Sequence, residues 1–192
     1  MVMTQRTPEK EKKDTSNVPH EASRKKKLTH AFGLNEMTFL VVDKDRRPAA
    51  LIRTILRNLS AKEVHYANHY EQAIHILETT RIDMVISELV FGEDNRMGGI
   101  TLAKGIRGAS FEDYQRVPII MATSATAEIN IHAARDAGVN EVMAKPMTPL
   151  SVYKHISAVI AKPRDFIEVP LYIGPDRRRK VEFFETERRT QQ

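Results

Sequence analysis

Cysteine and tryptophan are absent from this 192-residue chain. Without cysteine there is no disulfide scaffold, no thiol nucleophile, and no cysteine-ligated zinc or iron–sulfur site. No apolar run approaches the about 18 residues that a membrane-spanning helix needs. The first residues are charged and lack the apolar segment of a secretory signal, so we expect a cytoplasmic protein. Lys and Arg total 30 against 25 Asp and Glu, a net charge of +5 that leaves only local patches for strong anion binding.

What the chain does have is divided into three segments. Residues 1–36 are rich in Pro, Lys, Glu, Ser and Thr and hold almost no apolar cluster, so we predict a disordered arm. Residues 37–162 carry nearly all of the periodic apolar pattern and are predicted to form the folded domain. Residues 163–192 form an arginine-rich tail, too short for an enzymatic or DNA-binding output domain.

The middle segment alternates short apolar runs with helical periodicity. A run such as residues 38–42 is typical of a strand buried on both faces, whereas apolar residues spaced three and four apart indicate amphipathic helices. Five such alternations predict a (βα)5 domain of the flavodoxin-like α/β class, a doubly wound parallel sheet with helices on both faces. The predicted strands lie at 38–42, 64–66, 82–89, 117–122 and 139–144.

Polar residues gather where these predicted strands end. Asp43 and Lys44 follow the first strand, Glu88 ends the third, Thr123 ends the fourth, and Lys145 follows the fifth. In parallel α/β sheets, ligands and chemistry lie at the carboxyl ends of the strands. This set could bind a cation or sense a phosphoryl group, or its members could simply satisfy one another's polar groups.

The residues on these strands resemble a known family. Residues 39–43, 83–88, 118–124 and 137–146 resemble, in order, four motifs of the CheY-like receiver domain of two-component response regulators. The resemblance implies a flavodoxin-like fold and phosphorelay signalling through protein partners rather than an enzymatic reaction. It also implies that Glu88 stands where the family has its phosphoacceptor aspartate, with Thr123 and Lys145 in their family positions.

The departures from the family pattern weigh more than the matches. The second acidic residue, which in the family is the main protein ligand of magnesium, corresponds to Lys44, and the aromatic switch residue corresponds to Val142. A lysine close to the cation's position disfavours metal, so we expect no metal site and weak or lost magnesium binding. An ammonium of Lys44 paired with Asp43 or Glu88 would need no ion.

Two interpretations of the pocket stay open. The longer Glu88 side chain could push its carboxylate outward, reaching Lys145 and the Thr123 hydroxyl, and so act as a built-in phosphate mimic. Alternatively, the site is degenerate and never switches. Both interpretations make the chain an atypical stand-alone pseudo-receiver, and a conventional phosphorylated regulator that tolerates Glu88 is the rival.

The tail offers a second candidate site. It carries Asp176 and then Arg177, Arg178 and Arg179, after apolar residues that could dock on the domain or on a partner. It resembles the Gly-Pro-Asp-Arg-Arg-Arg extension of some proteobacterial receiver proteins, and a CheY-like group with an arginine-rich extension binds cyclic di-GMP. A solvated basic tail is the alternative. We expect no membrane contact and no specific nucleic acid partner; weak non-specific nucleic-acid binding would show a steep salt dependence.

Overall fold

The computed structural model describes residues 33–91, 98–109, 112–124 and 128–178. Residues 1–32 of the predicted arm lie outside the described residues, and so does the tail from Arg179 onward. Among the described residues, no helix has the length and apolar character needed to cross a membrane. Leu34 lies inside the predicted arm but is only 1% exposed, because it packs against the core from a short 3-10 helix, η1, Leu34–Glu36.

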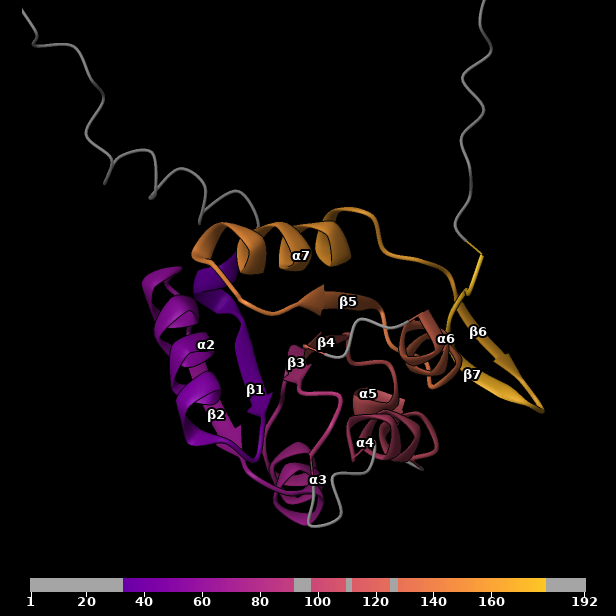
Figure 1. Ribbon diagram of the computed structural model, residues 1–192. Helices are drawn as coiled ribbons and strands as arrows, with labels where there is room; N and C mark the ends of the chain where they lie inside the picture. The colour runs from indigo at the N-terminus through magenta and orange to yellow at the C-terminus, as the bar shows by residue number, and fades with distance from the viewer. Residues whose placement is uncertain (1–32, 92–97, 110–111, 125–127, 179–192) are drawn as a thin grey trace, which may run out of the picture.

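The domain is built on five parallel strands in the order β2-β1-β3-β4-β5 (Figure 1). Each strand is followed by at least one helix, so the predicted (βα)5 flavodoxin-like fold is confirmed. The strands are β1 (Thr38–Val42), β2 (Glu63–Ala67), β3 (Met84–Ser87), β4 (Ile119–Thr123) and β5 (Glu141–Ala144). The helices are α2 (Arg46–Asn58), α3 (Tyr70–Thr79), α4 (Gly98–Arg107), α5 (Glu112–Gln115), α6 (Glu128–Asp136) and α7 (Pro149–Ala161).

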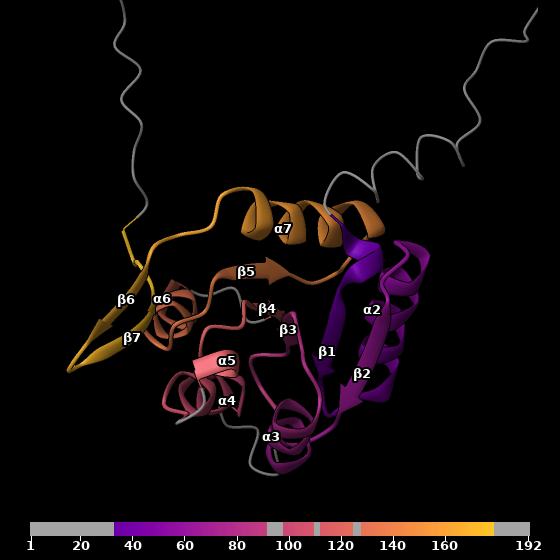
Figure 2. The same ribbon diagram turned by 180° about the vertical axis from the view of Figure 1, so that it is seen from behind.

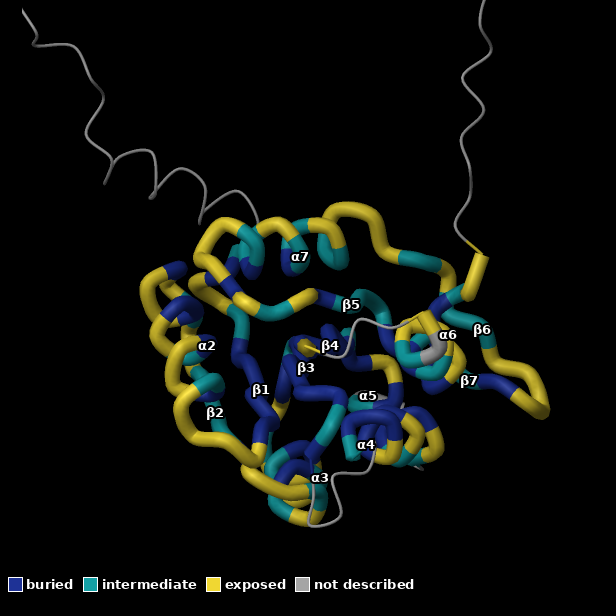
Figure 3. The backbone as a smooth tube through the Cα atoms, viewed as in Figure 1, coloured by how far each residue is buried: buried dark blue, intermediate teal, exposed yellow. Residues whose placement is uncertain are grey.

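Side chains alternate between the two faces of the sheet, as the two-residue period of a strand requires. Phe39 and Val41 of β1 belong to the apolar cluster covered by α2 and α7. Leu40 and Val42 belong to the opposite cluster, covered by α3, α4 and α6. Both faces are therefore buried, which explains why the strands read as continuous apolar runs (Figures 2 and 3).

The start of α7 is fixed by a complete capping box. The Thr148 hydroxyl accepts a hydrogen bond from the Ser151 amide at 3.1 Å, and the Ser151 hydroxyl accepts one from the Thr148 amide at 2.9 Å. Pro149 stands in the first turn, where its missing amide hydrogen is not needed. These contacts set the point where the chain turns after β5, three residues beyond Lys145.

Residues 166–175 form an antiparallel hairpin of β6 (Phe166–Val169) and β7 (Tyr172–Pro175). These residues belong to the predicted tail, whose apolar residues were expected to dock on the domain or on a partner, and the structure folds them against the domain beside α6 (Figures 1 and 2). Tyr172 is only 8% exposed, while Leu171 at the turn is 98% exposed. The hairpin lacks apolar area for a core of its own and uses the surface of the domain instead.

Candidate functional site

Four polar residues mark the carboxyl ends of four adjacent strands. Asp43 follows β1, Glu88 follows β3, Thr123 ends β4 and Lys145 follows β5. The registers of the parallel pairs keep these ends level, since Val42 lies opposite Ser87 and Thr123 lies opposite Ala144. The strand topology therefore places all four at one edge of the sheet.

Lys145 lies between the two carboxylates. Its Nζ is 3.1 Å from Oδ2 of Asp43, and it also forms an ion pair with Oε2 of Glu88. Asp43 is 2% exposed and Glu88 9%, and the Lys145 side chain is 19% exposed. The three residues form a largely buried group of one positive and two negative charges, which we call the Lys145 triad.

The Glu88 carboxylate is folded back onto its own loop. Oε1 accepts hydrogen bonds from the Leu89 amide at 2.7 Å and the Val90 amide at 3.4 Å, which leaves Oε2 for Lys145. The carboxylate thus contacts Lys145, one of the two groups that the longer side chain was expected to reach, while its other oxygen is held by the amides of its own loop.

Burial and ion pairing act together on the ionisation of the triad. Burial raises the pKa of Asp43, and the Asp45 amide and the Lys145 ammonium lower it without offsetting that effect. Burial alone would lower the pKa of Lys145, but its hydrogen bond to Glu88 and the charges of Glu88 and Asp43 raise it above 10.5. Lys145 is therefore a firmly charged ammonium at neutral pH.

Two further predicted site residues stand beside the triad. Lys44 directly follows Asp43 and is exposed. The ammonium that lies between the two carboxylates belongs to Lys145. Val142 lies on β5 opposite Met121 and is partly buried against the core beneath α3, α4 and α6. A valine has no ring that could move between a buried and an exposed position.

The donor set does not fit a magnesium ion. Magnesium needs several oxygen ligands in near-octahedral geometry. Oδ1 of Asp43 accepts from the Asp45 amide at 2.9 Å and Oδ2 faces Lys145, while both oxygens of Glu88 also have donors. Lys44 adds a positive charge next to this place. In the described part of the chain, no group of three or more His, Asp or Glu residues could hold a metal ion.

The described part of the arginine-rich tail is tied to the domain. Arg177 Nη1 donates to Oδ1 of Asp136 at 3.1 Å, and its guanidinium stacks 4.5 Å from the centre of the Tyr172 ring. The Arg178 amide donates to Oδ1 of Asp176 at 2.9 Å, and the Arg178 side chain is exposed. Arg177 therefore holds the hairpin against α6. Arg179, the third arginine of the predicted ligand site, lies outside the described residues.

Arg107, at the end of α4, was not predicted from the sequence as a structural or functional residue. It is 3% exposed, and its guanidinium donates to the carbonyls of Gly138, Gln115 and Val117 at 2.6–3.0 Å and to Oδ1 of Asn140 at 3.0 Å. Burial lowers the pKa of Arg107 to about 10, so the group stays charged at neutral pH. Its partners are 8 to 33 residues away in sequence, and periodicity carries no signal for them.

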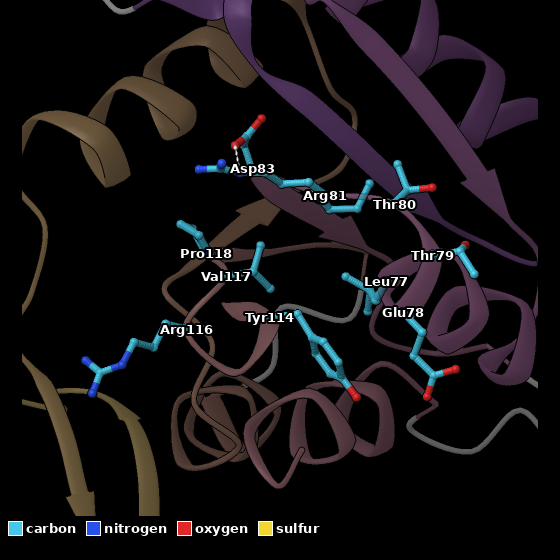
Figure 4. A pocket seen from close by; sticks show the side chains of 11 residues that line it. Leu77, Glu78, Thr79, Thr80, Arg81, Asp83, Tyr114, Arg116, Val117 and Pro118 are labelled. Atoms are coloured by element: carbon cyan, nitrogen blue, oxygen red, sulfur yellow. Dashed lines mark ion pairs between the residues drawn. The ribbon is translucent and has the colours of Figure 1, made fainter. Parts of the chain in front are cut away.

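A groove of about 910 Å³ lies at the amino edge of the sheet, opposite the triad. Residues 77–83 line one side, and Tyr114 and residues 116–118 line the other (Figure 4). Arg81 forms a long ion pair of 3.9 Å with Asp83, and Arg116 stacks 4.6 Å from the Phe166 ring of the hairpin. The groove is open and of mixed polarity, and none of the residues predicted for the pocket or the tail line it.

Comparison with known proteins decides the family. The model of the response regulator receiver domain family matches residues 39–157, more than half of the chain. The chain belongs to the response regulator receiver family. It is thus a receiver domain of two-component signalling, and the Lys145 triad occupies the carboxyl edge of its sheet. The β6–β7 hairpin begins beyond the matched residues.

Curated relatives and solved structures agree with this assignment. A chemotaxis protein CheY homolog of Campylobacter jejuni is 29% identical over 125 residues, which are 65% of this chain and 92% of the relative. Chemotaxis protein CheY1 of Helicobacter pylori is 28% identical over 65% of this chain and 97% of its own. The fold resembles Vibrio cholerae CheY4, with a TM-score of 0.57 at 24% identity over 64% of this chain and 98% of that one.

One structural neighbour was solved with its metal. The receiver domain of a Pseudomonas aeruginosa sensor histidine kinase has magnesium coordinated in its active-site cleft. Its TM-score to this chain is 0.57 at 23% identity, covering 66% of this chain and 98% of that domain. At that identity the likeness shows the fold alone.

Proposed function

We propose that this chain is an atypical receiver domain that signals through protein–protein contacts without accepting a phosphoryl group. The observation that carries the proposal is the ion pair between Lys145 and Glu88, at the place where the family phosphorylates an aspartate. The anion that pairs with Lys145 is the Glu88 carboxylate, a side chain of the protein itself. A phosphoryl group is therefore not needed to neutralise the Lys145 ammonium.

The charges around the triad support the same proposal. Lys44 replaces the family's metal-binding acid, and both carboxylates near it are already paired or hydrogen-bonded. Phosphoryl transfer to a carboxylate relies on a metal to neutralise the phosphate oxygens. A conventional phosphorylated regulator would have to break the triad before it could bind the metal.

The partner is proposed to be a protein of a two-component or chemotaxis-type pathway. Curated relatives that cover about two thirds of this chain are chemotaxis proteins. The described residues beyond the family match are mostly the end of α7 and the small hairpin. The chain is proposed to act as a binding module rather than an enzyme.

Magnesium titration tests the proposal. Calorimetry on the full chain is expected to show no saturable heat in the millimolar range, because the triad has no free carboxylate pair for the ion. Saturable binding that is lost in Glu88→Gln would support the conventional regulator instead. Glu71→Gln, which removes an exposed carboxylate on α3, serves as the control for a general change of charge.

Cyclic di-GMP binding is the second candidate function, and the exposed guanidinium of Arg178 favours it. Arg178 directly follows Arg177, whose guanidinium stacks on the Tyr172 ring, and such a set is suited to a ligand with two phosphates and two planar bases. Arg177 would first have to leave Asp136. The proposal here is a site whose affinity is limited by that ion pair.

This gives a testable expectation for the tail. If Arg177 is a ligand residue, Asp136→Asn should strengthen cyclic di-GMP binding by up to about fivefold, because the freed guanidinium no longer has to break an exposed ion pair of up to about 1 kcal/mol. Arg177→Ala and Arg178→Ala should each weaken it by about tenfold or more. Calorimetry with the dinucleotide is the measurement. If neither the wild type nor Asp136→Asn binds the dinucleotide up to about a millimolar, the tail is not a ligand site, and Arg177 only holds the hairpin against the domain.

A further inference from the structure

Helix α4 starts directly on the loop that carries Glu88. The Gly99 amide donates to the Leu89 carbonyl at 2.9 Å, and a Cβ at Gly99 would lie 2.2 Å from the Glu88 carbonyl oxygen. A Cβ at Gly98 would likewise lie 2.3 Å from the Phe91 carbonyl oxygen. Because backbone touches backbone here, a displacement of the Glu88 loop must displace the first turn of α4.

The other end of α4 holds the amino ends of β4 and β5. Arg107 is the last residue of the helix, and its guanidinium binds the Val117 carbonyl at 2.8 Å, the Gly138 carbonyl at 3.0 Å and Oδ1 of Asn140 at 3.0 Å. Oδ1 of Asn140 also accepts from the Ile119 amide at 2.9 Å. The position of Arg107 therefore determines the shape of the turn at residues 138–140.

The hairpin docks on this same turn. A Cβ at Gly174 would lie 2.8 Å from the Cα of Gly138, so the two backbones are in direct contact. Arg164, just before β6, donates from Nη2 to the carbonyls of Val139 and Asn140. The Phe166 ring of β6 lies 5.6 Å from the Arg107 guanidinium.

We propose that α4 couples the Glu88 site to docking of the β6–β7 hairpin, with Arg107 as the positioning residue that transmits the displacement. The helix is a stiff connection. Close backbone contacts fix its first turn to the Glu88 loop, and the hydrogen bonds of Arg107 fix its last turn to residues 117 and 138–140. An isolated two-stranded hairpin is at best marginally stable, so the docked and released hairpin are two discrete states that this connection can bias. Val142 is not required as a switch residue.

The output of this coupling is the presentation of the hairpin, whose turn carries the fully exposed Leu171. The inference goes beyond the proposed function and holds whether or not Glu88 accepts a phosphoryl group. It requires only that a change at the Glu88 loop alters hairpin docking. By linkage, release of the hairpin must alter the Glu88 loop to the same extent.

Hydrogen exchange with mass spectrometry on the full chain tests the coupling. Gly99→Ala forces α4 away from the Glu88 carbonyl, and we expect the amides of residues 166–175 to exchange about tenfold faster while those of β2 keep their rates. Gly105→Ala is the matched control on the same helix. Its Cβ meets only the tip of the Tyr70 side chain, at 2.4 Å, and hairpin exchange should stay within about twofold of wild type.

A second perturbation covers the case in which Gly99→Ala fails to fold. Glu88→Ala removes the acceptor of the Leu89 and Val90 amides and should also accelerate exchange in the hairpin. In an Arg107→Lys background, which keeps the charge but loses the forked hydrogen bonds, adding Glu88→Ala should change hairpin exchange less than about twofold. The coupling is overturned if hairpin rates stay at wild-type values in Gly99→Ala or Glu88→Ala. It is equally overturned if β2 and the hairpin accelerate together. The role of Arg107 is overturned if Glu88→Ala accelerates hairpin exchange as much in the Arg107→Lys background as in the wild type.

Discussion

The double variant Lys44→Asp/Glu88→Asp is expected to bind magnesium at least about a hundredfold more tightly than the wild type and to become phosphorylated by acetyl phosphate. Each charge replaced about 4 Å from the ion changes its energy by roughly 1 to 4 kcal/mol between bulk water and a protein surface. The shorter aspartate side chain should also be less able than Glu88 to reach both Lys145 and the loop amides. Calorimetry and intact-mass measurement follow the two gains.

The single variants separate the two causes. Glu88→Asp alone keeps the Lys44 charge and should remain largely unphosphorylated, and Lys44→Asp alone keeps the Lys145 ion pair with Glu88. If Glu88→Asp alone accepts the phosphoryl group as readily as the double variant, the Lys44 charge is not what blocks metal binding. The account of the acidic pocket would then be wrong on that point.

Lys145→Met is expected to lower the free energy of unfolding by about 2 to 4 kcal/mol at neutral pH. Removing one partner of a buried ion pair leaves the other charges uncompensated, and here two carboxylates lose their common cation. Lys154→Met removes an exposed lysine from the neighbouring helix α7 and should change stability by less than about 0.5 kcal/mol. Urea unfolding of both variants makes the comparison.

The pH dependence of that loss follows from the raised pKa of Lys145. A pKa above 10.5 in the folded protein means that its contribution to stability is fully present below 10.5 and is lost as the pH rises through the folded value. The difference between wild type and Lys145→Met should therefore be constant around neutral pH and shrink above 10.5. Adding Glu88→Gln to Lys145→Met should restore part of the stability, because one uncompensated carboxylate is removed. A loss in Lys145→Met no greater than that in Lys154→Met would contradict the triad.

The three central strands, β1, β3 and β4, could be predicted because each is buried on both faces. Residues 38–42 read as one apolar run in the sequence and form β1 with the same bounds. The edge strand β2 is partly exposed. It was predicted at residues 64–66, and in the structure it is one residue longer at each end. The four-residue helix α5 is too short to show a helical period and was not predicted.

The site could be predicted only as far as topology decides it. Parallel strands bring Asp43, Glu88 and Lys145 to one edge, but side-chain directions and hydrogen bonds decide which ammonium lies between the carboxylates. The sequence indicated that apolar residues of the tail could dock on the domain or on a partner, but not that they form a hairpin. Its docking depends on Arg107 and Arg164, whose partners lie many residues away in sequence, and on the close approach of Gly138 and Gly174.

Intact-mass measurement of the wild-type chain after incubation with acetyl phosphate and magnesium tests the central claim most directly. The claim is that Lys145 and Glu88 already form the ion pair that a phosphoryl group would otherwise make. The account predicts an unchanged mass, with the Lys44→Asp/Glu88→Asp variant as the positive control. A mass increase of about 80 Da in the wild type that disappears in Glu88→Gln would contradict it.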